Sequence, residues 1–252
     1  ILILFLLLSS KASAENGSAL WLRFDQEKSL PNIKAVNGNP TLTAVREIQK
    51  AWAELSGTTL SVSNKLAEQT LIIGTVKDKN ISSFGLKKQL QALGEEGYLI
   101  KTIRTDNTQQ VLIASEGEQG LLYGAFHFLR LIQTGQMPNN WDIAEKPTYN
   151  IRVLNHWDNL NGTVERGYAG YSLWDWEDLP QQISPRYEAY ARANASIGIN
   201  ATVLNNVNAS PDILRKNYLL KVKALADIFR PYGIKVYLSV NFSSPKILDN
   251  LP

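Results

Sequence analysis

Apolar residues recur at helical spacing in two stretches of the first half of the chain. The first stretch follows Asn39 and Pro40, residue types that favour an N-cap and a first helical position, and Gly57 is placed to end it. The second stretch, residues 119–133, is apolar on most of its surface, so we expect it to be buried against a sheet. The apolar positions of the first predicted helix are Leu42, Val45, Ile48, Trp52 and Leu55.

Short runs of aliphatic and β-branched residues lie around these two helices. They predict strands at residues 20–24, 59–62, 71–76, 98–103 and 111–114. Strands that share one segment with two packed helices are typical of an α+β domain with a central sheet. We place this domain at residues 15–145, because a polar, proline-bearing connection over 137–140 and 145–147 closes it.

After this connection, strands and helices alternate. Strands are predicted at residues 151–156, 199–205 and 234–241, and Ser184-Pro185 and Ser210-Pro211 are typical starts for the two helices between them. The run Pro231-Tyr232-Gly233 is placed to stop the second helix. This order predicts right-handed βαβ units and a parallel sheet.

The second segment, residues 146–252, is too short to be a finished α/β domain. A (β/α)₈ TIM barrel takes roughly 250 residues, so three strands correspond to the first part of such a barrel. A doubly wound sheet would begin in the same way, but the loop after the first strand lacks the glycine-rich phosphate fingerprint. We therefore predict an α+β domain followed by a truncated α/β barrel.

The ends of the chain carry their own signals. The opening run ILILFLLL is shorter than the roughly 20 residues that span a bilayer, and Ala12-Ser13-Ala14 resembles a signal peptidase site. We interpret residues 1–14 as the remnant of a signal peptide, so the protein is exported to the periplasm or the medium and has no membrane span in its mature form. The alternative is a buried N-terminal strand. At the other end, Asp249 to Pro252 follow a predicted strand without a helix stop, and we expect further chain beyond them.

Composition excludes several classes of protein. The 252 residues contain no cysteine, which excludes a disulfide scaffold, a cysteine-ligated metal site and thiol catalysis. The 26 basic and 23 acidic residues give a net charge of +3 without a basic block, which argues against nucleic-acid binding. Two histidines show no metal-ligand spacing, so we expect neither a metal nor a cofactor.

Candidate chemistry lies in the loops after the three strands of the second segment, where a barrel carries its site. Trp157 follows the first strand, and with the tyrosines further along this loop it offers flat apolar faces beside hydrogen-bonding groups, a pairing that suits a sugar. Glu165 and Arg166 lie on the same loop and are either a solvated pair or part of the site. We expect Trp174 and Trp176 to pack in the core, His156 to make a structural hydrogen bond and Asp158 to anchor backbone amides.

The residues of this loop also resemble a known family. The run VLNHWDNLNGTVERGYAG, residues 153–170, closely resembles the start of the catalytic barrel in glycoside hydrolase family 67, the xylan α-1,2-glucuronidases. Residues 195–200 and 203–208 look like the second barrel strand of that family and the loop after it. The front domain, with GLLYG at 120–124 opening its last helix, is similar to the α+β domain that precedes the barrel in family 67 and in hexosaminidases, a hexosaminidase domain 2-like fold.

The resemblance implies hydrolysis of the α-1,2 bond between (4-O-methyl)glucuronic acid and xylose in xylo-oligosaccharides known as aldouronic acids. It implies an inverting mechanism whose catalytic carboxylates lie on later strands, so no catalytic residue is expected in this chain and the chain alone is expected to be inactive. It also suggests a homodimer formed through a region beyond Pro252. The residues that match the family's substrate pocket are Trp157 as a sugar contact, Val207 beside the sugar 4-position, Glu165 and Arg166 as a charged pair, and Asn205 and Asn206 as hydroxyl partners.

Two other functions remain open from the sequence. An exported carbohydrate-binding module would hold a glycan on its aromatic loop without cleaving it. A different hexosaminidase-like glycosidase would carry an acidic Asp-Glu pair downstream and act on N-acetylhexosamine.

Overall fold

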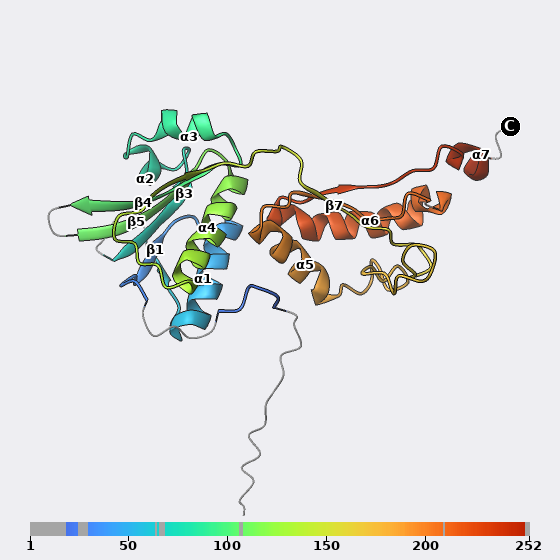
Figure 1. Ribbon diagram of the computed structural model, residues 1–252, viewed down its shortest axis with the longest axis horizontal. Coiled ribbons are helices and arrows are strands. Elements are labelled where there is room, and N and C mark those ends of the chain that lie inside the picture. Colours follow the sequence, from blue (N-terminus) through green and yellow to red (C-terminus); the bar gives the residue numbers. More distant parts are fainter. Residues whose placement is uncertain are drawn as a thin grey trace, which may run out of the picture.

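The structure is a computed structural model that describes residues 19–24, 30–63, 65, 69–105, 108–208 and 210–249. The predicted signal remnant, residues 1–14, lies outside the described residues. Figure 1 shows two sheets, a larger one in the first half of the chain and a smaller one in the second, with helices between them. No helix in the described ranges is long and apolar enough to cross a membrane.

The first sheet has the strand order β2-β1-β3-β5-β4-β6. Its central strands β1, β3 and β5 run parallel, whereas β4 pairs antiparallel with both β5 and β6. The predicted α+β class with a central sheet therefore describes this half well. The strands are β1 (Ala35–Asn37), β2 (Ser61–Val62), β3 (Thr70–Thr75), β4 (Tyr98–Thr105), β5 (Thr108–Ser115) and β6 (Asp142–Glu145).

Helices cover both faces of this sheet, because successive apolar side chains of its strands point to opposite faces. Leu71 and Ile73 of β3 belong to a core shared with α1 (Thr43–Ser56) and α4 (Glu118–Gln133), whereas Ile72 points to the opposite face. That second face packs against two short helices, α2 (Lys79–Ser82) and α3 (Lys87–Leu93). The predicted burial of residues 119–133 is confirmed, because α4 is buried along most of its length.

The second half is built on a parallel sheet of the order β7-β8-β9 within the described residues. The predicted alternation of strands and helices is confirmed: α5 connects β7 to β8, and α6 connects β8 to β9. Ser184 caps α5 as predicted, since its hydroxyl accepts a hydrogen bond from Arg186 N. The elements are β7 (Val153–Asn155), α5 (Pro185–Ser196), β8 (Ala201–Val203), the 3₁₀ turn η1 (Pro211–Leu214), α6 (Lys216–Phe229), the 3₁₀ turn η2 (Arg230–Tyr232), β9 (Lys235–Tyr237) and α7 (Ser244–Asp249).

The two halves share one hydrophobic core and are joined by charged side chains. Glu47 of α1 accepts a hydrogen bond from Arg192 Nε of α5 at 2.6 Å, and both side chains are largely buried. Arg152, just before β7, pairs with Glu96 at 2.8 Å. Apolar residues of α1 and α4 belong to the same buried cluster as those of α5 and α6, so the second sheet is held at a defined place beside the first.

Several predictions about local structure are wrong. Residues 20–24 form a turn and irregular chain rather than a strand, because Leu20 has a φ of 52°, which breaks an extended run. The Asn39 side chain accepts hydrogen bonds from the backbone and hydroxyl of Thr41, so it closes a turn and α1 begins only at Thr43. The short helices α2 and α3 were not predicted, since their few apolar positions give no clear period.

Two predictions near the end of the chain are also wrong. Ser210 caps η1 instead of the long helix, and Arg215, with a ψ of 148°, separates η1 from α6. The chain after β9 does not run on as strand, because α7 forms over Ser244–Asp249. Asn241 starts this change, since its side chain accepts hydrogen bonds from the backbone and hydroxyl of Ser243.

Candidate functional site

The carboxyl ends of β7, β8 and β9 lead into three loops at the same edge of the second sheet. Because the strands are parallel, the residues after each strand lie side by side, and this is the edge on which α/β proteins carry their sites. The loop between β7 and α5 is the longest of the three and folds back on itself through two isolated bridges, one from Asp158 to Val164 and one from Thr163 to Tyr171. The candidate site therefore consists of a folded first loop beside the ends of two further strands.

Glu165 holds a central place in the first loop. Its backbone N–H donates to the Trp157 carbonyl at 2.9 Å. Its own carbonyl accepts from Asn159 Nδ2 at 2.8 Å and from Asn206 Nδ2 at 3.2 Å. With these three bonds the loop holds Glu165 at a φ of 58°, a left-handed conformation that is rare for a residue with a side chain. The structure thus brings Trp157, Glu165 and Asn206 together.

Among the predicted site residues, the side chains of Trp157, Val207 and Arg166 are exposed to solvent. Trp157 is 41% exposed and Val207 48% exposed, so both present apolar surface that is not used in packing. Within the described ranges, neither Glu165 nor Arg166 forms an ion pair, and no side-chain hydrogen bond joins Arg166 or Val207 to the other predicted residues. A solvated Glu165–Arg166 pair is therefore not what holds this loop.

Asn205 and Asn206 are buried and connect the loops. Asn205 Nδ2 donates to the Ser239 carbonyl and its Oδ1 accepts from Ser239 N, both at 2.9 Å, which joins the end of β8 to the end of β9. Asn206 Oδ1 accepts from Asn208 N while its amide nitrogen holds Glu165. Both side chains are 2% exposed, so the geometry gives them a supporting role, and direct binding to a sugar stays a prediction.

Asp158 anchors the far side of the first loop, as the sequence predicts. The side chain is almost fully buried. Its Oδ2 accepts from the Ser172 hydroxyl at 2.6 Å and from Leu173 N at 2.8 Å, and its Oδ1 lies 3.5 Å from His156 Nδ1. One carboxylate therefore ties residues at both ends of the loop.

A buried polar chain continues from Asp158 into the sheet. His156 Nε2 lies 2.7 Å from the Tyr190 hydroxyl, which lies 2.9 Å from Thr202 Oγ1. Burial raises the pKa of Tyr190 to about 12, and the nearby Asp158 charge adds to this effect. The predicted structural hydrogen bond of His156 is confirmed, but nothing in the local pattern indicates the Tyr190 hydroxyl as its partner, because Tyr190 falls on an apolar position of the predicted helix. The packing of Trp174 and Trp176 is confirmed, since both are nearly fully buried.

Acid should weaken the anchor that Asp158 provides. Burial alone would raise the pKa of Asp158, but the hydrogen bonds from His156, Ser172 and Leu173 outweigh it and hold this pKa below its usual 3.8. The folded pKa is depressed, so the stabilisation is complete above pH 3.8 and is lost as the pH falls through the folded-state value.

The variant Asp158→Asn keeps the shape and removes the charge, so we expect it to be less stable than the wild type by about 1.5–3 kcal/mol near neutral pH. Urea unfolding as a function of pH measures this difference, which should shrink below pH 3.8. A difference that stays constant down to pH 2 would contradict the assignment.

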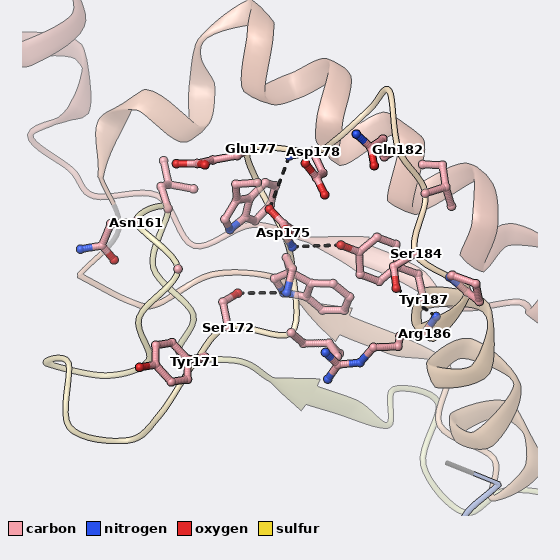
Figure 2. Close-up of a pocket in the computed structure, with 17 residues that line it drawn as sticks. Asn161, Tyr171, Ser172, Asp175, Glu177, Asp178, Gln182, Ser184, Arg186 and Tyr187 are labelled. Carbon is pink, nitrogen blue, oxygen red and sulfur yellow. Dashed lines mark hydrogen bonds between the residues drawn. The ribbon is translucent and has the colours of Figure 1, made fainter. Parts of the chain in front are cut away.

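Two pockets adjoin these loops. One, of about 500 Å³, is lined by residues of the first loop and of the β8 loop, among them Asp158, Asn205 and Asn208. The other, of about 580 Å³, lies between the first loop and the start of α5 (Figure 2). Leu160 and Asn161 line both pockets, so the two are neighbours. Sequence reasoning missed the second pocket, although the alternation of indoles and carboxylates over residues 174–178 is a signal that could have indicated it.

The described ranges contain no group of three His, Asp or Glu side chains that could hold a metal ion. The side chains at the candidate site offer recognition by apolar surface and hydrogen bonds. Exposed indole and valine surface lies beside a carboxylate on a fixed backbone, an arrangement that suits a ligand with apolar C–H faces and hydroxyl groups.

Comparisons with known proteins agree with this description. Residues 20–128 match the model of the glycosyl hydrolase family 67 N-terminus, and residues 131–252 match that of the family 67 middle domain. Alpha-glucuronidase A of Emericella nidulans is 34% identical over 99% of this chain, and an alpha-glucuronidase of Hypocrea jecorina is 32% identical over all of it. The chain spans 31% of the length of the first of these relatives and 32% of the second.

Solved structures show the same fold at much lower sequence identity. A family GH115 4-O-methyl-alpha-glucuronidase with specificity for decorated arabinogalactans has a TM-score of 0.55 at 14% identity, over 80% of this chain and 28% of its own. A GH138 enzyme that targets pectin rhamnogalacturonan II has a TM-score of 0.50 at 14% identity, over 79% of this chain and 30% of its own. At such identities the likeness describes the fold alone.

Proposed function

The chain belongs to glycoside hydrolase family 67, and from this premise we propose that it is the N-terminal portion of an exported α-glucuronidase. The relatives that match along the whole chain carry the name alpha-glucuronidase, which supports hydrolysis of a glucuronoside. They are about three times as long as this chain, so we place the catalytic carboxylates in the part of the protein that follows it.

The proposed substrate is a xylo-oligosaccharide that carries (4-O-methyl)glucuronic acid in an α-1,2 bond to xylose. The proposed mechanism is inverting: a carboxylic acid protonates the leaving oxygen, and carboxylates on the opposite face activate water. The two carboxyl groups of such a pair lie about 6.5–9.5 Å apart to make room for that water. In this proposal the present chain supplies one wall of the substrate site and none of the proton transfers.

The observation that carries the proposal is the arrangement at the strand ends, where exposed apolar surface lies beside a carboxylate on a fixed backbone. Trp157 offers its exposed indole to the C–H face of a sugar. Val207 offers apolar surface where an O-methyl group on the sugar 4-position would lie. Glu165 and Arg166 offer an acceptor and donors for hydroxyl and carboxylate groups. Asn206 holds the backbone carbonyl of Glu165, and Asn205 joins the end of β8 to the end of β9.

We propose the following organisation for the whole protein. The three parallel strands with α5 and α6 are the first part of a (β/α)₈ barrel over residues 146–252, and residues 15–145 form a hexosaminidase domain 2-like α+β domain. Residues 1–14 are the remnant of the export signal, and a homodimer forms through later parts of the protein. The parallel order of β7, β8 and β9 supports the barrel, because barrel strands follow one another in this way.

Replacing Trp157 tests the proposed wall. In the full-length protein we expect Trp157→Ala to lower kcat/KM for release of glucuronic acid from an aldouronic acid by about 10-fold or more, since loss of ~1.4 kcal/mol of transition-state binding has this effect. The melting temperature should change little, because the indole is 41% exposed. Trp21→Ala is a control, since this indole is 49% exposed and lies in the first half of the chain. An unchanged kcat/KM in Trp157→Ala would make this residue merely structural.

A further inference from the structure

We propose that the pocket between the first loop and the start of α5 binds neutral sugar units of the glycan main chain, away from the bond that is cleaved. The proposal rests on the glucuronidase function above and adds a second binding place to it. The pocket has a volume of about 580 Å³, within the range of roughly 300–1,000 Å³ that is usual for small-ligand sites. It shares Leu160 and Asn161 with the pocket beside Asn205, so a chain-like ligand could pass from one to the other.

The charged side chains of this pocket are available to a ligand. Figure 2 shows Asp175, Glu177 and Asp178 along one side and Arg186 reaching in from the start of α5. None of these four side chains takes part in an ion pair with any residue in the ranges that the structure describes. The Asp175 carboxylate accepts only a long bond, 3.4 Å, from Asp178 N. Carboxylates and a guanidinium without ion-pair partners can accept from and donate to sugar hydroxyls.

One residue that lines the pocket, Trp176, has a buried hydrogen-bond donor without an acceptor in the described part of the chain. Trp176 lines the pocket and is 3% exposed, yet its buried Nε1 has no acceptor among the described residues. A buried donor without a partner is rare in folded proteins and costs free energy. Its backbone carbonyl, by contrast, accepts from Lys221 Nζ, so the residue is otherwise well held.

An aromatic ring stands at the edge of the same pocket. Tyr171 is 93% exposed, so its ring does not contribute to the core. Its backbone is paired with Thr163 through an isolated bridge, and Figure 2 shows the Tyr171 side chain on the loop beside the pocket. An exposed ring on a rigid backbone is a surface on which a pyranose can stack its C–H face.

The charge of the pocket indicates which sugars it takes. Three carboxylates and one guanidinium line the pocket. This excess of negative charge repels the carboxylate of a uronic acid. Neutral pentose units lack that charge and keep the hydroxyls that the side chains can bind. The pocket therefore fits the uncharged main chain of the proposed substrate and disfavours its acidic side group.

Titration of the full-length protein with xylohexaose, which carries no glucuronic acid, tests this proposal without any need for hydrolysis. Tryptophan fluorescence reports binding, because Trp174 and Trp176 line the pocket. We expect saturable binding, a Kd at least threefold higher in Tyr171→Ala, and an unchanged Kd in Tyr149→Ala, an exposed tyrosine outside the pocket. Hexagalacturonic acid should bind more weakly than xylohexaose, and the double variant Glu177→Gln/Asp178→Asn should reduce that difference.

The two proposals can fail separately. Equal Kd values for the wild type and Tyr171→Ala, or tighter binding of hexagalacturonic acid than of xylohexaose, would overturn the main-chain pocket even if the full-length protein releases glucuronic acid. Binding that depends on Tyr171, together with a full-length protein that releases no glucuronic acid, would retain the pocket and remove the glucuronidase function.

Discussion

We expect Glu47→Ala to destabilise the protein by about 3–5 kcal/mol, because it leaves a buried guanidinium without its partner. Glu47 Oε2 lies 2.6 Å from Arg192 Nε, and the two side chains are 5% and 12% exposed. Arg192 Nη2 already lacks a partner among the described residues, and the Arg192 guanidinium lies over the Phe24 ring at 5.8 Å. A protein of this size should then melt on the order of 10 °C lower.

Denaturant unfolding of single and double variants distinguishes two causes of lower stability: loss of the ion pair and loss of packing. Glu47→Leu with Arg192→Met replaces both charges by apolar side chains and should recover most of the stability, because the unpaired charge is the main cost. Asp142→Ala is the matched control: it breaks the Lys101–Asp142 pair, whose carboxylate is 72% exposed, and should cost less than ~1 kcal/mol. If Glu47→Ala behaved like Asp142→Ala, the buried pair would not hold the two halves together.

We expect Glu165→Gln to lower kcat/KM of the full-length enzyme by about 10- to 100-fold without loss of stability. A hydrogen bond to a charged group contributes about 1.5–3 kcal/mol. The Glu165 carboxylate forms no ion pair with any residue in the described part of the chain, so it is free to bind a substrate hydroxyl. The backbone supports a role for this side chain: three hydrogen bonds hold Glu165 at a φ of 58°, a conformation that glycine adopts at lower cost.

Glu165→Gly makes this prediction sharper. Removing the left-handed strain should keep or raise the melting temperature, while activity falls as in Glu165→Gln. Glu54→Gln on α1 removes the same charge at an exposed place far from the site and should change neither quantity. A Glu165→Gly enzyme that is stable and fully active would show that the side chain serves neither binding nor catalysis.

Local patterns in the sequence predict much of the fold. Side chains alternate between the two faces of a strand. In β3, Leu71 and Ile73 therefore lie on one face and Ile72 on the other. Gly57 and Gly233 end helical segments in the left-handed conformation that glycine adopts readily. Both signals depend on neighbours in sequence, so they can be interpreted without knowing the tertiary structure.

Long-range contacts could not be predicted in this way. Glu47 and Arg192 are 145 residues apart, and on their helices each looks like an ordinary charged position. Asn206 and Glu165 are 41 residues apart, so the support of the strained backbone appears only once β7 and β8 are paired. The prediction of Asn39 as a helix N-cap is wrong for a local reason. An asparagine side chain stabilises a turn as well as a helix start, and sequence alone does not decide between them.

For the candidate site, the family-like run of residues 153–170 predicts a position and a sugar-type chemistry, but not how the side chains of this run are held. The prediction grouped Asn205 and Asn206 with Trp157 as direct sugar contacts. The structure buries both amides among backbone groups of the neighbouring loops, because the ends of parallel strands leave backbone groups that need partners. The division between exposed and supporting residues depends on burial, which the sequence does not display.

Hydrolysis of a defined aldouronic acid by the full-length protein, followed by NMR from the first minutes, tests the central claim most directly. We predict release of free (4-O-methyl)glucuronic acid that appears first as the β anomer, because an inverting enzyme turns the configuration of the α bond it cleaves. Release of N-acetylhexosamine from a hexosaminide instead, or binding of the oligosaccharide without any release of uronic acid, would contradict the assignment of this chain to a glucuronidase.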